Sequence, residues 1–482
     1  MINFKVIFNI IGFLLVLDGI AMLFGIPFSI YYHDNDIFAL LISGAGTSLI
    51  GFVMYYFTKG SDKELRKREG YIVVSLGWIA MTIFGAIPFI VHGSIPNITD
   101  AFFETMSGFT TTGASILNDI EAMPHGLLFW RSLTQWLGGM GFIVLSLAIL
   151  PILGIGGMQL FVAEVPGPTK DKIHPRVRET AKRLWGIYVI FTVVEILLLN
   201  VGGMDIFDSI CHSFTTMATG GFSTKQNSIA YYGSPFIQYV IVLFMFIAGM
   251  NFSLHYYWLH RKVKVVTQNE EFKFYSFLII SFTILITVGM LFSGNNDFEL
   301  TFRESLFQVV SMITTTGFVT ADYVMWGVFF HVIFFLLLFI GGSAGSTGGG
   351  IKVVRHLLLI KNSALELRRL VHPRAVIPVR YNKAAVNQEI IFNIMAFLLF
   401  YIAIFILGTL LLAFIGLDFL TSMGAVATSL GNVGPAIATV GPIENFSHIP
   451  DVGKWILSFL MLMGRLELFT VLIIFSPSFW KK

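Results

Sequence analysis

Long apolar stretches alternate with short polar ones along almost the whole chain. Runs of about 20 apolar residues recur from Phe4 to Phe475, and a helix of that length crosses the roughly 30 Å hydrocarbon core of a bilayer. We therefore expect an all-α polytopic membrane protein. The pattern predicts ten spanning helices, near residues 5–31, 36–58, 71–92, 126–152, 184–203, 235–259, 274–293, 325–360, 388–415 and 454–475.

A second pattern occurs four times between the predicted spans. Each copy is a moderately apolar stretch of about 15 residues that ends in a glycine turn. The closing glycines are separated by 107, 97 and 117 residues, which is the length of one repeated unit. We align the Gly-Asn-Val-Gly of the fourth and most divergent copy with the Thr-Thr-Thr-Gly of the first and third. The four glycines are Gly113, Gly220, Gly317 and Gly434.

Each copy is too short to cross a bilayer, so we expect it to enter part way and return as a re-entrant loop. One unit is then a helix, a half-helix, a glycine turn and a second helix. Four such helix, re-entrant pore loop and helix repeats would form a single-chain pseudotetrameric pore, with two extra helices at the N-terminus. The predicted units are residues 1–60 for those two helices and 70–165, 180–265, 272–370 and 385–482 for the repeats.

The residue types in the glycine turns suit a dehydrated cation such as potassium. Successive backbone carbonyls can replace the hydration shell of the ion, and glycine permits the backbone angles that turn carbonyls inward. Each half-helix would also aim the negative end of its dipole at the ion. A helix cap and turn would explain one copy, but four copies at repeat spacing favour an ion filter. The candidate ion-binding residues are Thr111, Thr112, Gly113, Ala218, Thr219, Gly220, Thr315, Thr316, Gly317, Asn432, Val433 and Gly434.

Charge adds an orientation to this picture. Charged residues make up 12% of the chain and the net charge is +3. Six segments hold 26 of the 31 basic residues, and all fall on one side if ten helices are counted. Because Lys and Arg accumulate in cytoplasmic loops, we expect both termini in the cytoplasm. We expect the opposite loops to be acidic, with Asp100, Glu104, Asp119, Glu121, Asp297, Glu299, Asp322, Asp418, Glu444 and Asp451.

Two features inside predicted spans are candidates for a gate. Residues 341–350 hold six glycines in ten positions, a composition that breaks a helix or packs helices closely. The candidate gate residues there are Gly345, Gly348, Gly349 and Gly350. Arg465 is expected in the middle of the last span, as the only basic residue placed so deeply in the chain. A charge there is a functional hypothesis, and the alternative is a structural arginine bound to carbonyls.

Other candidate chemistry is limited. Asp18 and Glu195 fall within predicted spans, where interhelical hydrogen bonding or headgroup-level placement would account for them. The lone cysteine, Cys211, excludes a disulfide framework and a cysteine-rich metal site. We expect no catalytic residues, no cofactor and no transition metal.

These motifs resemble the Trk, Ktr and HKT superfamily of potassium transporters, and within it the bacterial Trk-type uptake proteins. The resemblance covers the whole chain and includes the segments 136–142 and 341–352. It implies potassium uptake through a filter above a gating loop that Arg465 faces, in which glycine at position 113 favours potassium over sodium. It also implies a homodimer in the bacterial inner membrane and a cytosolic nucleotide-binding regulatory ring of the TrkA kind.

Three alternatives stay open. A sodium or mixed sodium/potassium transporter would use the same loops. A proton-coupled symporter would need a titratable group on the path, and the filter positions carry none. An intramembrane serine hydrolase is suggested by the G-x-S-x-G pattern around Ser343, which requires a strand, a turn and a helix in that order.

Overall fold

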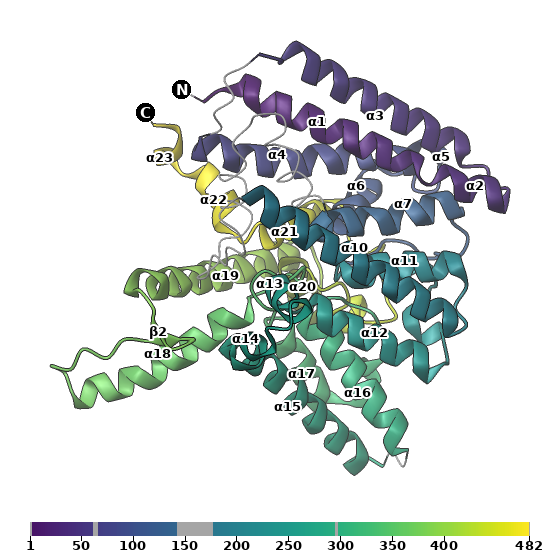
Figure 1. Cartoon of the computed structure of the whole chain (residues 1–482). Coiled ribbons are helices and arrows are strands. Elements are labelled where there is room, and N and C mark those ends of the chain that lie inside the picture. Colours follow the sequence, from purple (N-terminus) through teal and green to yellow (C-terminus); the bar gives the residue numbers. More distant parts are fainter. Residues whose placement is uncertain (1, 61–65, 142–176, 295–296, 482) are drawn as a thin grey trace.

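The computed structural model describes residues 2–60, 66–141, 177–294 and 297–481, and nearly all its regular structure is helical (Figure 1). The two termini lie on the same side of the helix assembly, at the left in Figure 1, and α18 (Val353–Val371) projects from that side. A hydrogen bond of 2.7 Å from Arg68 Nη1 to Lys481 O ties the start of α4 to the C-terminal end. The shared side agrees with an even number of crossings.

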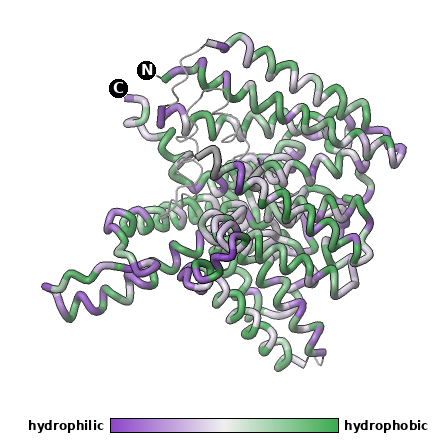
Figure 2. Tube along the Cα trace, in the orientation of Figure 1, coloured by the Kyte–Doolittle hydropathy of each residue, from purple (hydrophilic) through white to green (hydrophobic). Residues whose placement is uncertain are grey.

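Six long apolar helical segments in the described part of the chain are suited to cross a membrane. They expose many large apolar side chains, and the tube along them is largely green, the colour of hydrophobic residues, in Figure 2. The prediction of an all-α, multi-pass membrane protein is confirmed. The segments are α1 with α2 (Phe4–Leu23, Ile26–Tyr32), α3 (Ile37–Phe57), α4 with α5 (Lys67–Gly85, Ile87–His92), α10 (Val177–Val201), α15 (Glu270–Phe292) and α19 (Gln388–Phe414).

The N-terminal helices α1 and α3 pack through glycines. A methyl group on Gly12 would lie 2.7 Å from Gly51 O, and one on Gly19 would lie 2.5 Å from Gly44 O. Side chains at these positions would force the two backbones apart. Small residues therefore allow the close helix contact that is typical of membrane proteins.

Four short helices occupy the four predicted half-helix positions. They contain 12 to 16 residues, or roughly 18–24 Å at 1.5 Å per residue, which is too short to span. Each begins at an Asn or Asp whose side chain accepts a backbone N–H of the first turn. In the last of them, hydrogen bonds from Thr421 hold the pKa of the Asp418 carboxyl below its usual value. The helices are α6 (Ile98–Phe109), α11 (Ile206–Met217), α16 (Phe298–Ile313) and α20 (Phe419–Gly431), capped by Asn97, Asp205, Asp297 and Asp418.

The second long helix is interrupted in the last three units. The predicted continuous spans 235–259 and 454–475 are wrong, because α12 (Pro235–Ala248) meets α13 (Phe252–Leu259) at 103° and α21 (Asp451–Arg465) meets α22 (Phe469–Phe475) at 115°. The predicted break within 325–360 is present, between α17 (Val328–Leu337) and α18. Of the predicted span 126–152, α7 (His125–Trp136) and the π-helix η1 (Leu137–Gly141) are observed, and the remainder lies outside the described residues.

The remaining elements are short. Strands β1 (Arg380–Tyr381) and β2 (Ala384–Ala385) form an antiparallel hairpin, with Arg380 opposite Ala385. The other helices have three to six residues each. They are α14 (Val263–Gln268), α23 (Pro477–Trp480), η2 (Ser228–Tyr231), η3 (Tyr323–Trp326) and η4 (Ala438–Val440).

Candidate functional site

The four short helices end in the same turn. In each, a backbone N–H two or three residues past the helix bonds to a carbonyl five residues earlier, as in a Schellman motif. The residue between the helix and the donor has a left-handed backbone, with φ between 52° and 59°. The bonds run from Thr112 N to Ser107 O (2.9 Å), Gly220 N to Thr215 O (2.8 Å), Thr316 N to Ser311 O (2.8 Å) and Val433 N to Thr428 O (3.1 Å).

Three of the four left-handed residues are threonines. Thr111, Thr219 and Thr315 have φ values of 53°, 53° and 59°, in a region that costs an L-residue roughly 1–2 kcal/mol and that β-branched residues rarely adopt. Asn432 (φ 52°) is the fourth and tolerates this region better. Repeated backbone strain of this kind is typical of functional sites.

The loops after these residues follow one another in a closed ring. An added methyl group on one glycine of each loop would lie within 3 Å of a carbonyl oxygen of the next loop. All four glycines have positive φ, from 77° to 97°. We call them the ring glycines. The contacts are Gly113 to Gly220 O (2.2 Å), Gly221 to Thr316 O (2.1 Å), Gly317 to Val433 O (2.0 Å) and Gly434 to Thr112 O (2.9 Å).

The alignment of the second copy is therefore wrong by one residue. Gly221, and not Gly220, shares the positive φ and the neighbour contact of Gly113. Gly220 takes the place of Thr112, Thr316 and Val433, whose carbonyls form the other members of the ring. Two consecutive glycines leave this register ambiguous in the sequence, and only the folded neighbours decide it.

One cavity lies against all four ring glycines. Its lining also includes Lys225 and Glu444, so both charge signs occur around it. We call this side of the ring the cavity face and the opposite side, toward residues 341–350, the loop face.

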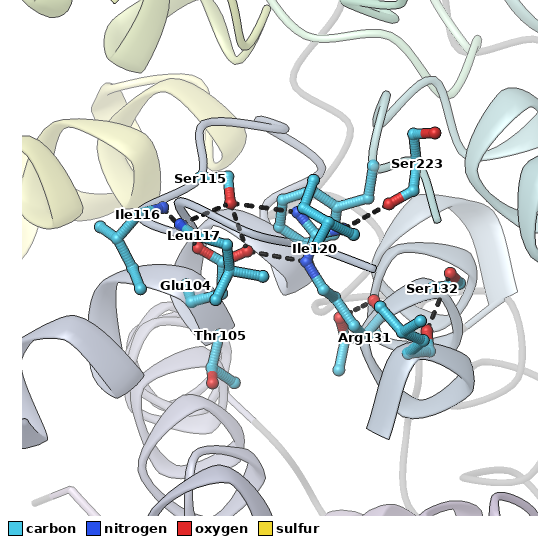
Figure 3. A network of polar contacts seen from close by, with 12 residues as sticks. Glu104, Thr105, Ser115, Ile116, Leu117, Ile120, Arg131, Ser132 and Ser223 are labelled. Carbon is cyan, nitrogen blue, oxygen red and sulfur yellow. Dashed lines mark hydrogen bonds and ion pairs between the residues drawn. The ribbon is translucent and has the colours of Figure 1, made fainter. Parts of the chain in front are cut away.

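On the cavity face, a buried ion pair joins the first two loops (Figure 3). Arg131 Nε bonds to Glu104 Oε1 at 2.7 Å, with side-chain exposures of 2% and 1%. Arg131 Nη1 donates to Ser223 O (2.9 Å) in the second loop, and Glu104 Oε2 accepts Ile116 N (2.8 Å) from the first. The expectation of Glu104 in an aqueous loop is wrong, because it lies inside α6 facing this cation.

The helix position of Glu104 also carries a polar side chain in the next two short helices, α11 and α16. His212 Nε2 is 2.9 Å from Ser223 Oγ, and Gln308 Nε2 donates to Ala321 O at 3.2 Å. Glu104, His212 and Gln308 are equally spaced from their ring glycines. Each short helix of the first three units thus holds the chain that leaves its loop, whereas Ala425 occupies this position in the fourth.

The left-handed residues meet the loop face. Thr111 Oγ1 accepts a hydrogen bond from Arg465 Nη1 (3.1 Å), and Thr315 Oγ1 accepts Gly349 N (2.6 Å). Thr219 Oγ1 lies 3.3 Å from Thr347 Oγ1. The candidate filter and the glycine-rich segment are therefore in direct contact. In the fourth loop, Asn432 Nδ2 donates to Thr112 Oγ1 (2.9 Å) and bridges to the first.

Arg465 ends α21 at the bend and does not lie mid-helix as expected. Its guanidinium donates to the carbonyls of Gly138, Gly139 (2.6 Å) and Thr347 (2.8 Å). Other basic residues inside predicted spans are more enclosed, since Arg131, Lys352 and Arg355 are buried whereas Arg465 is half-buried. An Arg inside the predicted span 126–152 was the signal that could have identified Arg131.

The segment 341–350 forms an irregular loop held at several points. Phe252 N donates to Gly345 O (3.0 Å), and Ala344 N donates to Glu271 Oε1 (2.6 Å). Gly345 and Gly350 have φ values of 74° and 65°, which explains the glycine at these two positions. Lys352 Nζ donates to Gly348 O within the segment.

Beside this loop, Arg355 of α18 pairs with Glu467 at the α21–α22 bend. This contact joins the helix that follows the glycine-rich loop to the bend next to Arg465. Ser343 follows helix α17, so the strand that a nucleophile elbow needs before its serine does not precede it.

Three candidates from the sequence lie apart from the ring glycines. Asp18 in α1 and Glu195 in α10 are 2% and 0% exposed, so neighbouring helices enclose both carboxyl groups. Cys211 is buried in α11.

Comparisons with known proteins agree along the full chain. The family model TrkH, described as a cation transport protein, matches residues 37–293 and 294–482. The chain is 43% identical over 487 residues to the Trk system potassium uptake protein TrkH of Escherichia coli (strain K12), with all of both chains covered. It is 35% identical over 483 residues to TrkG of the same strain, with 99% of each covered. The crystal structure of the potassium transporter TrkH from Vibrio parahaemolyticus superposes with a TM-score of 0.89 at 37% identity and covers all of both chains.

Proposed function

This chain belongs to the TrkH family of cation transport proteins, and from that membership we propose that it carries potassium ions across a bacterial membrane through the ring of four loops. The observation that supports this best is the closed order of the ring contacts, in which each ring glycine faces a backbone carbonyl of the next loop. The path would run along the axis of the ring.

The ring supplies what a dehydrated potassium ion requires. Its ligands are backbone carbonyls from four loops, which can replace the hydration shell. Four short helices end at the ring, and the negative ends of their dipoles favour a cation without a formal charge. Glycine is required where an L side chain would project onto the neighbouring carbonyls. The hydroxyl groups of Thr111, Thr219 and Thr315 would hold the ring loops in place from the loop face.

The glycine-rich loop and Arg465 form the gate in this proposal. Thr347 and Gly349 contact the left-handed threonines of two loops, and Arg465 donates both to the loop and to Thr111. Arg465 holds the loop across the path by these hydrogen bonds, and movement of the loop would open it. Gly345, Gly348 and Gly350 give the segment the backbone freedom to move.

The wider assembly follows the same family reasoning. We propose that the protein forms a homodimer in the inner membrane, with both termini and α18 in the cytoplasm, the loop face inward and the cavity face outward. The basic residues of 352–383 would contact a cytosolic nucleotide-binding ring of the TrkA kind. We also propose that the chain is divided into five units, at residues 1–60, 70–165, 180–265, 272–370 and 385–482. Potassium is the transported ion, and transport uses no cofactor.

Uptake by purified protein in lipid vesicles tests the proposal. Vesicles with a potassium gradient should take up potassium and rubidium well above empty vesicles, and sodium far more slowly. Because none of the candidate filter residues is titratable, uptake should not require a pH gradient. Equal uptake of sodium would favour the mixed transporter, and uptake only with a pH gradient would favour the symporter.

A further inference from the structure

The second ring loop lacks a side chain that the other three loops have. Just before the ring glycine stand Thr112, Thr316 and Val433, but in the second loop Gly220 occupies this position. The side chain of Gln135, which is 0% exposed, fills the space. A methyl group on Gly220 would lie 2.4 Å from both Cδ and Oε1 of Gln135.

Gln135 binds the backbone on both sides of the ring glycine of that loop. Its Nε2 donates to Gly220 O at 2.7 Å, and its Oε1 accepts Phe222 N at 3.0 Å. One amide thus holds the peptide groups before and after Gly221. Within the described chain, the equivalent carbonyls of the other three loops accept no hydrogen bond.

Gln135 also differs from its counterparts in the other repeats. It stands three residues before the pair Gly138-Gly139 in the π-helix η1. The same spacing before Ala248-Gly249, Gly341-Gly342 and Gly464-Arg465 leads to Met245, Leu338 and Met461, which are 0–1% exposed. In the other repeats, the residue equivalent to Gln135 is apolar, and the loop residue equivalent to Gly220 has a side chain. Only the second loop combines a glutamine with a glycine.

We propose that Gln135 is a positioning residue of the ion path that sets cation selectivity through the second loop. Its amide replaces the missing side chain and fixes the Gly220 carbonyl, which shares its lone pairs with Nε2 and is a weaker ion ligand than the other three carbonyls. The four carbonyls of the ring therefore bind potassium with unequal strength, and the weaker ligand helps the ion to leave. This inference rests on the ring being the potassium path.

The test is a double-mutant cycle on the potassium-to-sodium permeability ratio in vesicles. Gln135→Met removes both hydrogen bonds and should lower the ratio about tenfold. Gly220→Thr alone should lower the permeability ratio at least as much as Gln135→Met does, because the added Cβ overlaps the Gln135 side chain. The double variant reproduces the pairings of Met245 with Thr316 and Met461 with Thr112, and should recover the ratio to within about threefold of wild type.

Ser132→Ala is the matched control, since Ser132 is buried on the same helix and its hydroxyl donates to Leu128 O (3.0 Å) without reaching the loop. It should leave the ratio unchanged. The ratio reports only on transporting molecules, so a misfolded fraction does not alter it. A wild-type ratio in Gln135→Met, or a double variant no better than the worse single one, overturns the proposal.

The potassium KM adds a readout that a purely structural role would not move. Freeing the Gly220 carbonyl from its donor should lower KM in Gln135→Met, and an unchanged KM and ratio would contradict the assignment. If Gly113→Ser changes selectivity while Gln135→Met does not, only this inference fails. If neither changes it, the proposed ring path fails as well.

Discussion

The two faces of the ring are supported in different ways. On the cavity face, three units use a polar side chain at the same register, namely Glu104, His212 and Gln308. On the loop face, the contacts come from Arg465 and from one glycine-rich segment that occurs once in the chain. Supports that recur with the repeat define the framework of the ring. Supports that occur once can change without dismantling it.

The contacts on the cavity face are also the stronger ones. Glu104 and Arg131 are buried and charged, and removing one partner of such a pair costs about 3–5 kcal/mol. The loop face has hydrogen bonds between neutral groups, each contributing about 0.5–1.5 kcal/mol, and hydrogen bonds from the Arg465 guanidinium to neutral acceptors, each contributing about 1.5–3 kcal/mol. A conformational change at the ring should therefore begin on the loop face.

The largest expected effect comes from breaking the cavity face. Arg131→Met leaves the Glu104 carboxylate buried without its cation and should lower the free energy of unfolding by about 3–5 kcal/mol. Thermal melting of the purified protein measures this loss. The double variant Glu104→Gln with Arg131→Met removes both charges and should melt higher than Arg131→Met. An unchanged melting temperature in the single variant would show that the cavity face is not the rigid one.

A smaller effect is expected from releasing the loop face at Arg465. Arg465→Ala removes the donors to Thr111, Thr347 and Gly139, and should raise potassium flux several-fold while melting changes little. Arg465→Lys keeps the charge but has fewer donors in a different geometry, so its flux should lie between alanine and wild type. Wild-type flux in Arg465→Ala would place the gate elsewhere. Flux as low as wild type in the lysine variant would indicate an electrostatic barrier.

The smallest effect should come from one hydroxyl on the loop face. Thr315→Val removes the acceptor of Gly349 N and keeps the shape, so it should shift the gating equilibrium by about two- to tenfold toward flux, as expected for 0.5–1.5 kcal/mol. Thr105→Val is the control, because among the described residues the Thr105 hydroxyl bonds only to Ala101 O, within its own helix. Equal fluxes in the two variants would argue against coupling between Thr315 and the loop.

The sequence predicts the framework well and its interruptions poorly. Apolar length and the recurring glycine turns predict the membrane helices and the short helices between them, since both depend on local composition. The bends near Gly249 and Gly464 were missed, because hydropathy does not register a helix break that is itself apolar. The run 341–350 was recognised because its glycines are numerous.

Tertiary partners explain the other errors. The register of Gly220 and Gly221 is visible only in the folded chain, where Gly221 faces Thr316 O and Gly220 contacts Gln135, 85 residues away in the chain. Glu104 was assigned to an aqueous loop because its cation, Arg131, belongs to the following helix. Arg465 was placed mid-span because the bend that ends α21 was not predicted.

The potassium-to-sodium permeability ratio of Gly113→Ser in vesicles tests the central claim most directly. A Cβ at this position would lie 2.2 Å from Gly220 O, so it displaces a ring carbonyl, and the ratio should fall by about tenfold or more. Gly186→Ser in α10, where an added Cβ meets no atom within 4 Å, should keep the wild-type ratio. An unchanged ratio in Gly113→Ser with flux intact would contradict the ring as the potassium filter.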